Sequence, residues 1–156
     1  FITKDQSVPP DGKTRTVRLA LQEPGMYRIT VSDGGDRTSV QWKQNTAMVM
    51  RSSLEQPIVT SGRWSLYFYV PEGTKRIGLH GGGTGSILDP EGQEQFTLQN
   101  RKAGFYSLPV PAGSDGKLWK VNHASGAIRL LTVPPYFARN AKELLLPQEV
   151  IEADRD

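Results

Sequence analysis

The stretch Trp64-Ser65-Leu66-Tyr67-Phe68-Tyr69-Val70, followed by Pro71-Glu72-Gly73, decides the fold class of this chain. One set of alternate positions holds the large apolar residues Trp64, Leu66, Phe68 and Val70. Successive side chains of a β-strand point to opposite faces, so this alternation predicts a strand that turns one face toward a core. The Pro-Glu-Gly sequence that follows is typical of a turn.

The same pattern recurs on both sides of this stretch. Turn clusters such as Pro24-Gly25, Asp89-Pro90-Glu91-Gly92 and Pro111-Ala112-Gly113 separate short alternating segments, and helical periodicity is nearly absent. The predicted strands cover residues 16–21, 26–31, 38–43, 64–70, 76–80, 86–88, 94–98, 105–110, 117–122 and 127–133. About ten strands require two packed sheets, because a single sheet would leave half of these apolar faces in water. We therefore predict an all-β fold, an antiparallel two-sheet β-sandwich of jelly-roll or Greek-key type.

The length of 156 residues suits one domain, since a domain typically holds about 150 residues. Near the C-terminus, Asn140 can cap a helical turn, Glu143 can reach back to it, and Pro147 can stop the helix. The prediction is a single sandwich domain over residues 1–156, with its core at 15–138 and a short helix and charged tail at 139–156. Because the chain begins at Phe1, we expect it to be processed or cut from a longer polypeptide.

Two predicted strands share the sequence Gly-x-Tyr-x-aliphatic-x-Val, at residues 25–31 and 104–110. Glycine supplies the turn into each strand, and the hydroxyl groups of Tyr27 and Tyr106 can bond back to a nearby carbonyl, as in a tyrosine corner. Two similar strands of one sandwich explain this repeat more simply than a duplication.

Residues 25–31, the sequence Phe68-Tyr69-Val70-Pro71-Glu72-Gly73-Thr74-Lys75 and the sequence Ile87-Leu88-Asp89-Pro90-Glu91-Gly92 carry a family resemblance. They resemble the jelly-roll and galactose-binding-like accessory domains, including the bacterial pre-peptidase C-terminal type and carbohydrate-binding modules. The similarity covers residues 15–135 and lies in strands and turns. It implies a secreted, non-catalytic bacterial module that binds a glycan or steadies a neighbouring domain.

Composition argues against several other functions. The net charge is +3 with cations scattered among acids, so we expect no nucleic-acid partner. No apolar run approaches the roughly 18 residues of a membrane span, so we expect no membrane partner. The absence of cysteine excludes disulfides, thiolate metal sites and a cysteine nucleophile.

Catalytic motifs are also missing, so we expect that the chain is not an enzyme. His80 and His123, the two histidines, each fall at a predicted strand end or loop, where the ring meets solvent. The glycine-rich residues 81–85 lack the Gly-Lys-Ser/Thr ending of a phosphate-binding loop and predict a flexible turn. No Gly-x-Ser-x-Gly elbow occurs, and most acids fall in turns.

Glycan recognition depends on aromatic rings that stack on the apolar face of a sugar. If Phe68 faces the core, Tyr67 and Tyr69 project from the opposite face and could form a stacking platform, unless a loop or the segment around Tyr136 covers them. Trp42 and Trp119 are further candidates, although their alternation favours the core for both. Arg76 could bond sugar hydroxyls or a uronate carboxylate. The predicted ligand-binding residues are therefore Tyr67, Tyr69, Trp42, Trp119 and Arg76.

A structural calcium ion is the one cofactor that the sequence leaves open. Hard cations take carboxylate and carbonyl oxygens from closely spaced turn residues, and Asp33, Asp36 and Asp89 are the candidate ligands. The alternative is that these acids only shape turns, and the missing twelve-residue calcium loop favours this alternative.

The expected function is that of a non-catalytic, carbohydrate-binding accessory module of a larger secreted bacterial enzyme, with a polysaccharide or oligosaccharide as its ligand. The alternative is a structural or protein-interaction domain that docks on other domains of the parent protein through the apolar residues 130–146.

Overall fold

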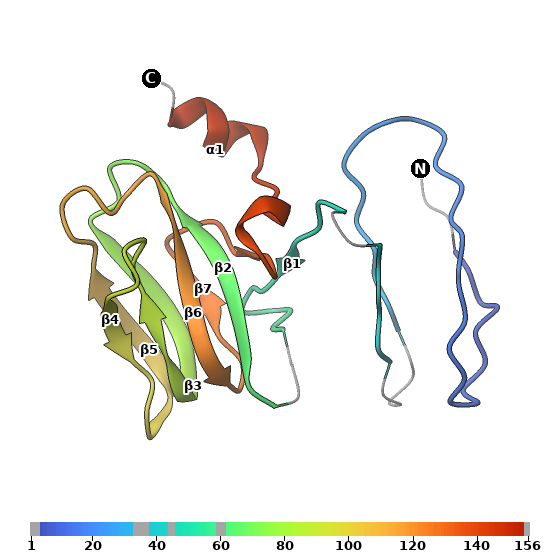
Figure 1. The fold of residues 1–156 in the computed structure, drawn as a ribbon, viewed down its shortest axis with the longest axis horizontal. Coiled ribbons are helices and arrows are strands. Elements are labelled where there is room, and N and C mark those ends of the chain that lie inside the picture. Colours follow the sequence, from blue (N-terminus) through green and yellow to red (C-terminus); the bar gives the residue numbers. More distant parts are fainter. Residues whose placement is uncertain (1–3, 33–37, 44–45, 59–61, 155–156) are drawn as a thin grey trace. The chain divides into compact units, whose positions relative to one another are not determined.

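The computed structural model describes residues 4–32, 38–43, 46–58 and 62–154, and its chain divides into two compact units (Figure 1). The first unit is Phe1–Trp42 and the second is Lys43–Asp156. All named strands and helices lie in the second unit. The sandwich elements thus begin after Trp42, whereas the sequence prediction placed a single core over residues 15–138.

The first unit forms no strand in the part that the structure describes, so the strands predicted over residues 16–21, 26–31 and 38–43 are wrong. Alternation fixes which side chains share a face, but a strand also needs a neighbour that satisfies its backbone hydrogen bonds. Trp42 is half-buried, but eight other large apolar side chains of these segments are 37–69% exposed: Val17, Leu19, Leu21, Met26, Tyr27, Ile29, Val31 and Val40. One local prediction is confirmed, since the Tyr27 hydroxyl donates to the carbonyl of Glu23.

The described residues of the second unit form eight strands in two antiparallel sheets (Figure 1). The strands are β1 (Met50–Arg51), β2 (Trp64–Val70), β3 (Arg76–Leu88), β4 (Glu94–Thr97), β5 (Arg101–Pro109), β6 (Lys117–Ser125), β7 (Arg129–Leu130) and β8 (Tyr136–Phe137). β1 pairs with β8, and the other six strands join in the order β2-β6-β3-β4, with β5 and β7 also paired to β3. The predicted all-β, two-sheet antiparallel fold is confirmed.

Strand β3 is long and belongs to two sets of pairs. Residues 76–81 pair with β5, and His80 pairs with Arg129 of β7, whereas residues 84–88 pair with β6 and β4. The glycines between the halves allow close backbone contact, because a Cβ on Gly82 would lie 2.6 Å from the Ala103 nitrogen. The prediction of a flexible turn at residues 81–85 is therefore wrong: these glycines lie inside a continuous strand.

The core lies on the inward face of β2, β3, β5 and β6, as the alternation of β2 predicts. The fully or almost fully buried apolar residues of this cluster include Leu66, Phe68, Val70, Ile77, Leu79, Ile87, Leu108, Trp119, Val121, Leu130 and Phe137. Trp119 packs at 6.5 Å from the ring of Phe68, and its indole Nε1–H donates to the Ser114 carbonyl at 2.7 Å. This bond satisfies the one polar group that the indole buries.

The C-terminal segment contains the predicted short helix, but at a different place. Asn140 caps a 3-10 turn, η1 (Ala141–Glu143), by accepting the Lys142 N–H at 3.0 Å, and the α-helix α1 (Gln148–Ala153) follows Pro147. Proline stands before this helix because the first helical positions need no backbone N–H donor. Within the described residues, no helix is long and apolar enough to cross a membrane.

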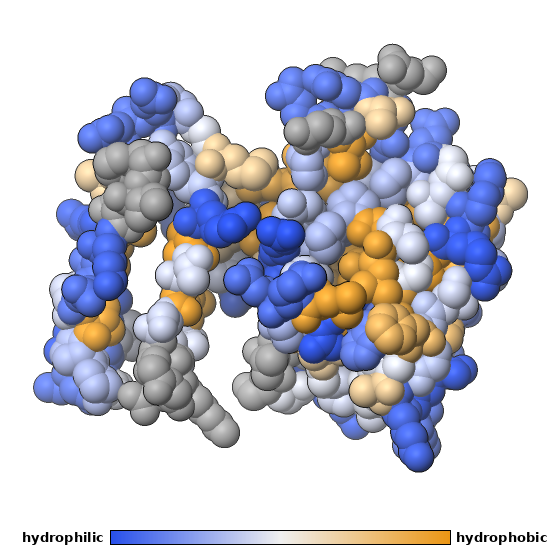
Figure 2. Space-filling model, turned by 180° about the vertical axis from the view of Figure 1, so that it is seen from behind, coloured by the Kyte–Doolittle hydropathy of each residue, from blue (hydrophilic) through white to orange (hydrophobic). Residues whose placement is uncertain are grey.

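The surface of the second unit mixes hydrophilic and apolar residues (Figure 2). In the view of Figure 2, apolar side chains gather near the middle of the larger body, with hydrophilic side chains around them. The large apolar residues most exposed in this unit are Leu54, Phe105, Leu131 and Ile151.

Candidate functional site

A polar depression of about 310 Å³ lies at one end of the β2-β6-β3-β4 sheet. Strand register builds it: Ser86 of β3 pairs with Asn122 of β6 on one side and with Thr97 of β4 on the other. Three hydrogen-bonding side chains therefore form one row across the outer face. The residues that line the depression are Arg63, Thr84, Gly85, Ser86, Glu94, Thr97, Gln99, Asn122 and His123.

A local irregularity of β6 fixes the two residues at one side of the depression. The backbone of His123 has a φ of 48°, a left-handed conformation that costs a non-glycine residue about 1–2 kcal/mol. The Ser65 hydroxyl holds it there by accepting the His123 N–H at 2.9 Å, and it lies 3.4 Å from Asn122 Oδ1. The prediction that the His123 ring meets solvent is confirmed, but the ring lies inside β6 and not beyond its end.

The depression carries one charge of each sign, from Arg63 and Glu94, which are both exposed. The remaining groups are hydroxyls, amides and an imidazole. Thr84 and Ser125 hydroxyls also bond to each other at 2.8 Å at its edge. This chemistry suits a neutral ligand with many hydroxyl groups, which can both donate and accept hydrogen bonds.

Tyr67 lies on the same outer face, one row away from the polar groups. It pairs with Lys120 of β6, which pairs with Leu88 of β3, and the Lys120 ammonium lies 5.7 Å from the Tyr67 ring centre. Residues two apart in a strand lie about 7 Å apart, so the row of Tyr67 adjoins the row of Ser65 and Asn122. The half-buried Tyr67 ring thus lies one row from the depression, with the Lys120 ammonium over one of its faces.

Tyr69, the second member of the predicted platform, is covered. Its hydroxyl donates to Asp154, and the second oxygen of Asp154 accepts the Glu72 N–H at 3.1 Å. The residue that follows α1 therefore engages the Tyr69 hydroxyl, and the Tyr69 side chain is half-buried, as is that of Tyr67. The C-terminal segment covers Tyr69 as the sequence allowed, but through Asp154 and not through the surroundings of Tyr136.

The ionisation of Tyr69 is expected at high pH. Burial of the phenol, and then the Asp154 carboxylate, raise the pKa of Tyr69 from 10.0 to about 12. Because the folded pKa is above the unfolded one, the contribution of Tyr69 to stability is complete below pH 10 and is lost as the pH rises toward about 12. A titration of tyrosinate absorbance, compared between wild type and Tyr69→Phe, measures this pKa. In the Asp154→Asn variant the pKa of Tyr69 should move only partly toward 10.0, because the phenol stays buried. A folded-state value near 10.0 in the wild type would contradict the contact.

The other predicted ligand-binding residues lie elsewhere. Trp119 is 0% exposed, so no face of its indole is open to a sugar, in keeping with the core placement that its alternation favours. Trp42 is half-buried and belongs to the first unit, whereas the depression is built from the second. Arg76 lies on the part of β3 that pairs with β5, where its Nε–H donates to the Ser107 hydroxyl at 2.9 Å.

Of the three predicted calcium ligands, Asp89 is the one that lies among the described residues. Asp33 and Asp36 lie outside those residues. Asp89 is buried, and its carboxylate accepts the N–H groups of Glu91 and Gln93 and the Gln95 amide at 2.7–3.0 Å. The Asp89 carboxylate thus shapes the turn between β3 and β4. No cluster of three or more metal-binding side chains occurs in the described part of the chain.

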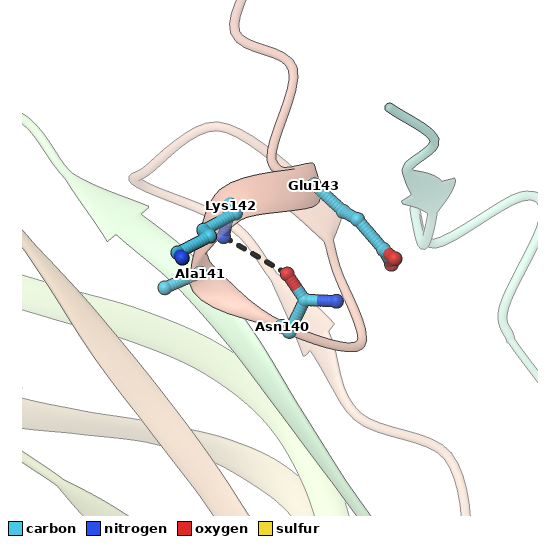
Figure 3. A pocket seen from close by; sticks show the side chains of 4 residues that line it. All are labelled: Asn140, Ala141, Lys142 and Glu143. Carbon is cyan, nitrogen blue, oxygen red and sulfur yellow. Dashed lines mark hydrogen bonds between the residues drawn. The ribbon is translucent and has the colours of Figure 1, made fainter. Parts of the chain in front are cut away.

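A larger hollow, of about 620 Å³, lies beside η1 and is a weaker candidate (Figure 3). Its lining residues are Asn140, Ala141, Lys142 and Glu143, which form one turn of chain. In Figure 3 the Glu143 carboxylate and the Lys142 ammonium point to opposite sides of the turn, so these charged groups do not converge. The smaller depression draws its groups from several strands, and we take it as the candidate site.

Sequence reasoning missed most of the depression. Ser86 and Asn122 lie at outward positions of predicted strands, which is the signal that could have marked them. Their neighbourhood depends on strand order and register, which alternation does not contain. Comparison with protein-family models, curated protein sequences and solved structures finds no match for this chain.

Proposed function

We propose that this chain is a non-catalytic carbohydrate-binding module that holds a glycan on the outer face of the β2-β6-β3-β4 sheet. The observation that carries the proposal is the convergence of polar side chains from several strands on one depression, beside the ring of Tyr67. Tyr67 offers an apolar surface to the C–H face of a sugar, and Asn122, Ser86 and Thr97 offer hydrogen bonds to its hydroxyls.

The charges of the depression support binding rather than catalysis. Cleavage of a glycosidic bond uses two carboxyl groups about 5–10 Å apart. Glu94 is the one carboxylate among the described residues that line the depression. The bond from the His123 N–H to the Ser65 hydroxyl suits a binding surface that is already formed before the ligand arrives.

The wider context of the proposal comes from the resemblance of residues 68–75 and 87–92, which lie in the second unit, to accessory domains of secreted bacterial enzymes. In that context the module places a catalytic domain of the same polypeptide close to its polysaccharide. Linking a binding module to an enzyme raises the local concentration of substrate without any new contact at the active site.

A second candidate function, docking on another protein, is supported by the exposed apolar side chains of the first unit, such as Met26 and Ile29. The region first predicted for docking, residues 130–146, contributes instead to the core through Leu130, Val133 and Phe137. A contiguous exposed apolar surface is typical of protein interfaces.

The proposal is tested by affinity electrophoresis in gels that contain neutral polymers: soluble cellulose derivatives, xylan, mannan or mixed-linkage β-glucan. One polymer should retard the wild type, and Tyr67→Ala and Asn122→Ala should each weaken this binding about tenfold, as expected for the loss of about 1.4 kcal/mol. Gln56→Ala, which removes an exposed amide outside the depression, is the control and should bind as the wild type does.

The midpoint temperature of thermal unfolding must be the same in the variants as in the wild type, so that a loss of binding reports on the site and not on the fold. If a polymer retards both variants as strongly as the wild type, the binding site lies outside the depression. No retardation by any of these polymers would overturn the proposal and favour the docking function.

A further inference from the structure

The outer face of β5, the first half of β3 and β7 carries a row of three planar side chains. Register places Phe105, His80 and Arg129 side by side on the three strands. The Phe105 ring meets the His80 ring edge to face, with 4.8 Å between the ring centres. The Arg129 Nη1 lies 3.0 Å from His80 Nδ1. Because a guanidinium can only donate, His80 Nδ1 accepts this bond and the neutral ring carries its proton on Nε2.

Phe105 is exposed over 71% of its surface although it lies in the middle of a strand. Transfer of a phenylalanine ring out of water lowers the free energy, so the exposed Phe105 ring is suited to contact with a bound ligand. His80 on one side fixes its orientation. An exposed aromatic ring with polar planar neighbours is the arrangement expected of a sugar-binding surface.

The charge of these strands is of one sign. Residues 76–81, 101–109 and 129–130 contain Arg76, Arg101, Lys102 and Arg129, and no Asp or Glu. None of the four cations forms an ion pair with the described part of the chain, but Arg101 lies over the Phe96 and Tyr106 rings, on the side of β5 opposite to Phe105. The Arg129 Nε–H is buried without a hydrogen-bond partner among the described residues, and Nη1 bonds to His80, so Nη2 and the second Nη1 hydrogen are the donors that a carboxylate would meet.

Arg76 extends this surface along β3. It is held by Ser107, which accepts from its Nε–H at 2.9 Å, and it lies four residues from His80. Four residues of a strand span about 14 Å, so Arg76 and Arg129 would contact different units of a polymer and not one monosaccharide. Arginine pairs with carboxylates in a bidentate manner, which a hydroxyl cannot match.

We propose that this face is a second glycan-binding site, specific for a polymer of uronic acids. Phe105 stacks on a sugar ring, and Arg129 and Arg76 bind carboxylates of units along the same chain. The site shares no residue with the depression beside Tyr67. It therefore stands whether or not a neutral glycan binds there.

The test compares polygalacturonate and alginate with fully methyl-esterified polygalacturonate, which keeps the rings but not the charge, and with polyglutamate, which keeps the charge but not the rings. Affinity electrophoresis and calorimetry at about 0.15 M salt suppress weak, long-range attraction. The wild type should bind at least one uronate polymer. It should bind the ester and polyglutamate at least tenfold more weakly.

Phe105→Ala and Arg76→Gln should each weaken uronate binding about tenfold. Leu54→Ala and Lys142→Gln, which remove an exposed apolar group and an exposed cation elsewhere, should leave it unchanged. Tyr67→Ala and Asn122→Ala should also leave it unchanged, which separates this site from the first. The proposal is overturned if neither uronate polymer binds, if polyglutamate binds equally well, or if Phe105→Ala binds as the wild type does.

Discussion

Substitution of Gly85 by alanine is expected to lower the free energy of unfolding by about 3 kcal/mol or more. Gly85 has a φ of +106°, and a Cβ there would lie 2.6 Å from Ala124 Cα and 2.8 Å from the Ala124 nitrogen. These are backbone atoms of the paired strand β6, so they cannot move aside without breaking the pairing of β3 with β6. Denaturation by urea, followed by circular dichroism, measures the change.

Gly92→Ala is the matched control for this prediction. Gly92 also has a positive φ, +83°, but a Cβ there meets nothing within 4 Å. The Gly92→Ala substitution should lower the free energy of unfolding by the backbone strain alone, about 1–2 kcal/mol. If Gly85→Ala costs no more than Gly92→Ala, the close approach of β3 to β6 is wrong.

Truncation of Trp119 to alanine is expected to be equally severe, with a loss of about 3–5 kcal/mol of stability. The indole is completely buried, packs near Phe68, and donates its N–H to Ser114. Its removal leaves a large cavity and an unpaired carbonyl. The loss should appear in urea denaturation with and without glycan.

Trp119→Phe separates packing from binding. It keeps an aromatic ring in the core, so it should cost less and leave a folded protein whose affinity for glycans equals that of the wild type. A folded Trp119→Phe variant with weakened glycan binding would contradict the buried position and return Trp119 to the list of ligand-binding residues.

Strand β3 connects the two proposed surfaces. Its first half places Arg76 and His80 on the face with Phe105, and its second half places Thr84 and Ser86 in the polar depression. Glycines between the halves let one strand pair with different neighbours along its length. A substitution that changed the pairing of this strand would therefore disturb both surfaces, whereas the side-chain substitutions proposed above each address one surface.

The amino-acid sequence by itself determined the local features. The alternation over β2 predicted its bounds and the burial of Leu66, Phe68 and Val70, and the Gly-x-Tyr pattern predicted the hydroxyl bond of Tyr106, which donates to the Lys102 carbonyl at 2.6 Å. These features depend on residues close together in the chain, so a single segment contains the information that they need.

Only the tertiary structure decided which segments pair and which surfaces result. Alternation in residues 16–31 is as clear as in β2, yet no strand forms there, because a strand exists only when another chain segment satisfies its backbone groups. The Tyr69 hydroxyl bonds to Asp154, which lies 85 residues further along the chain. The depression results from the register of Ser86 with Asn122 and Thr97. The surface proposed for uronate binding results from the pairing of Phe105, His80 and Arg129. Each of these joins residues far apart in the sequence, and such contacts depend on strand order and register rather than on local pattern.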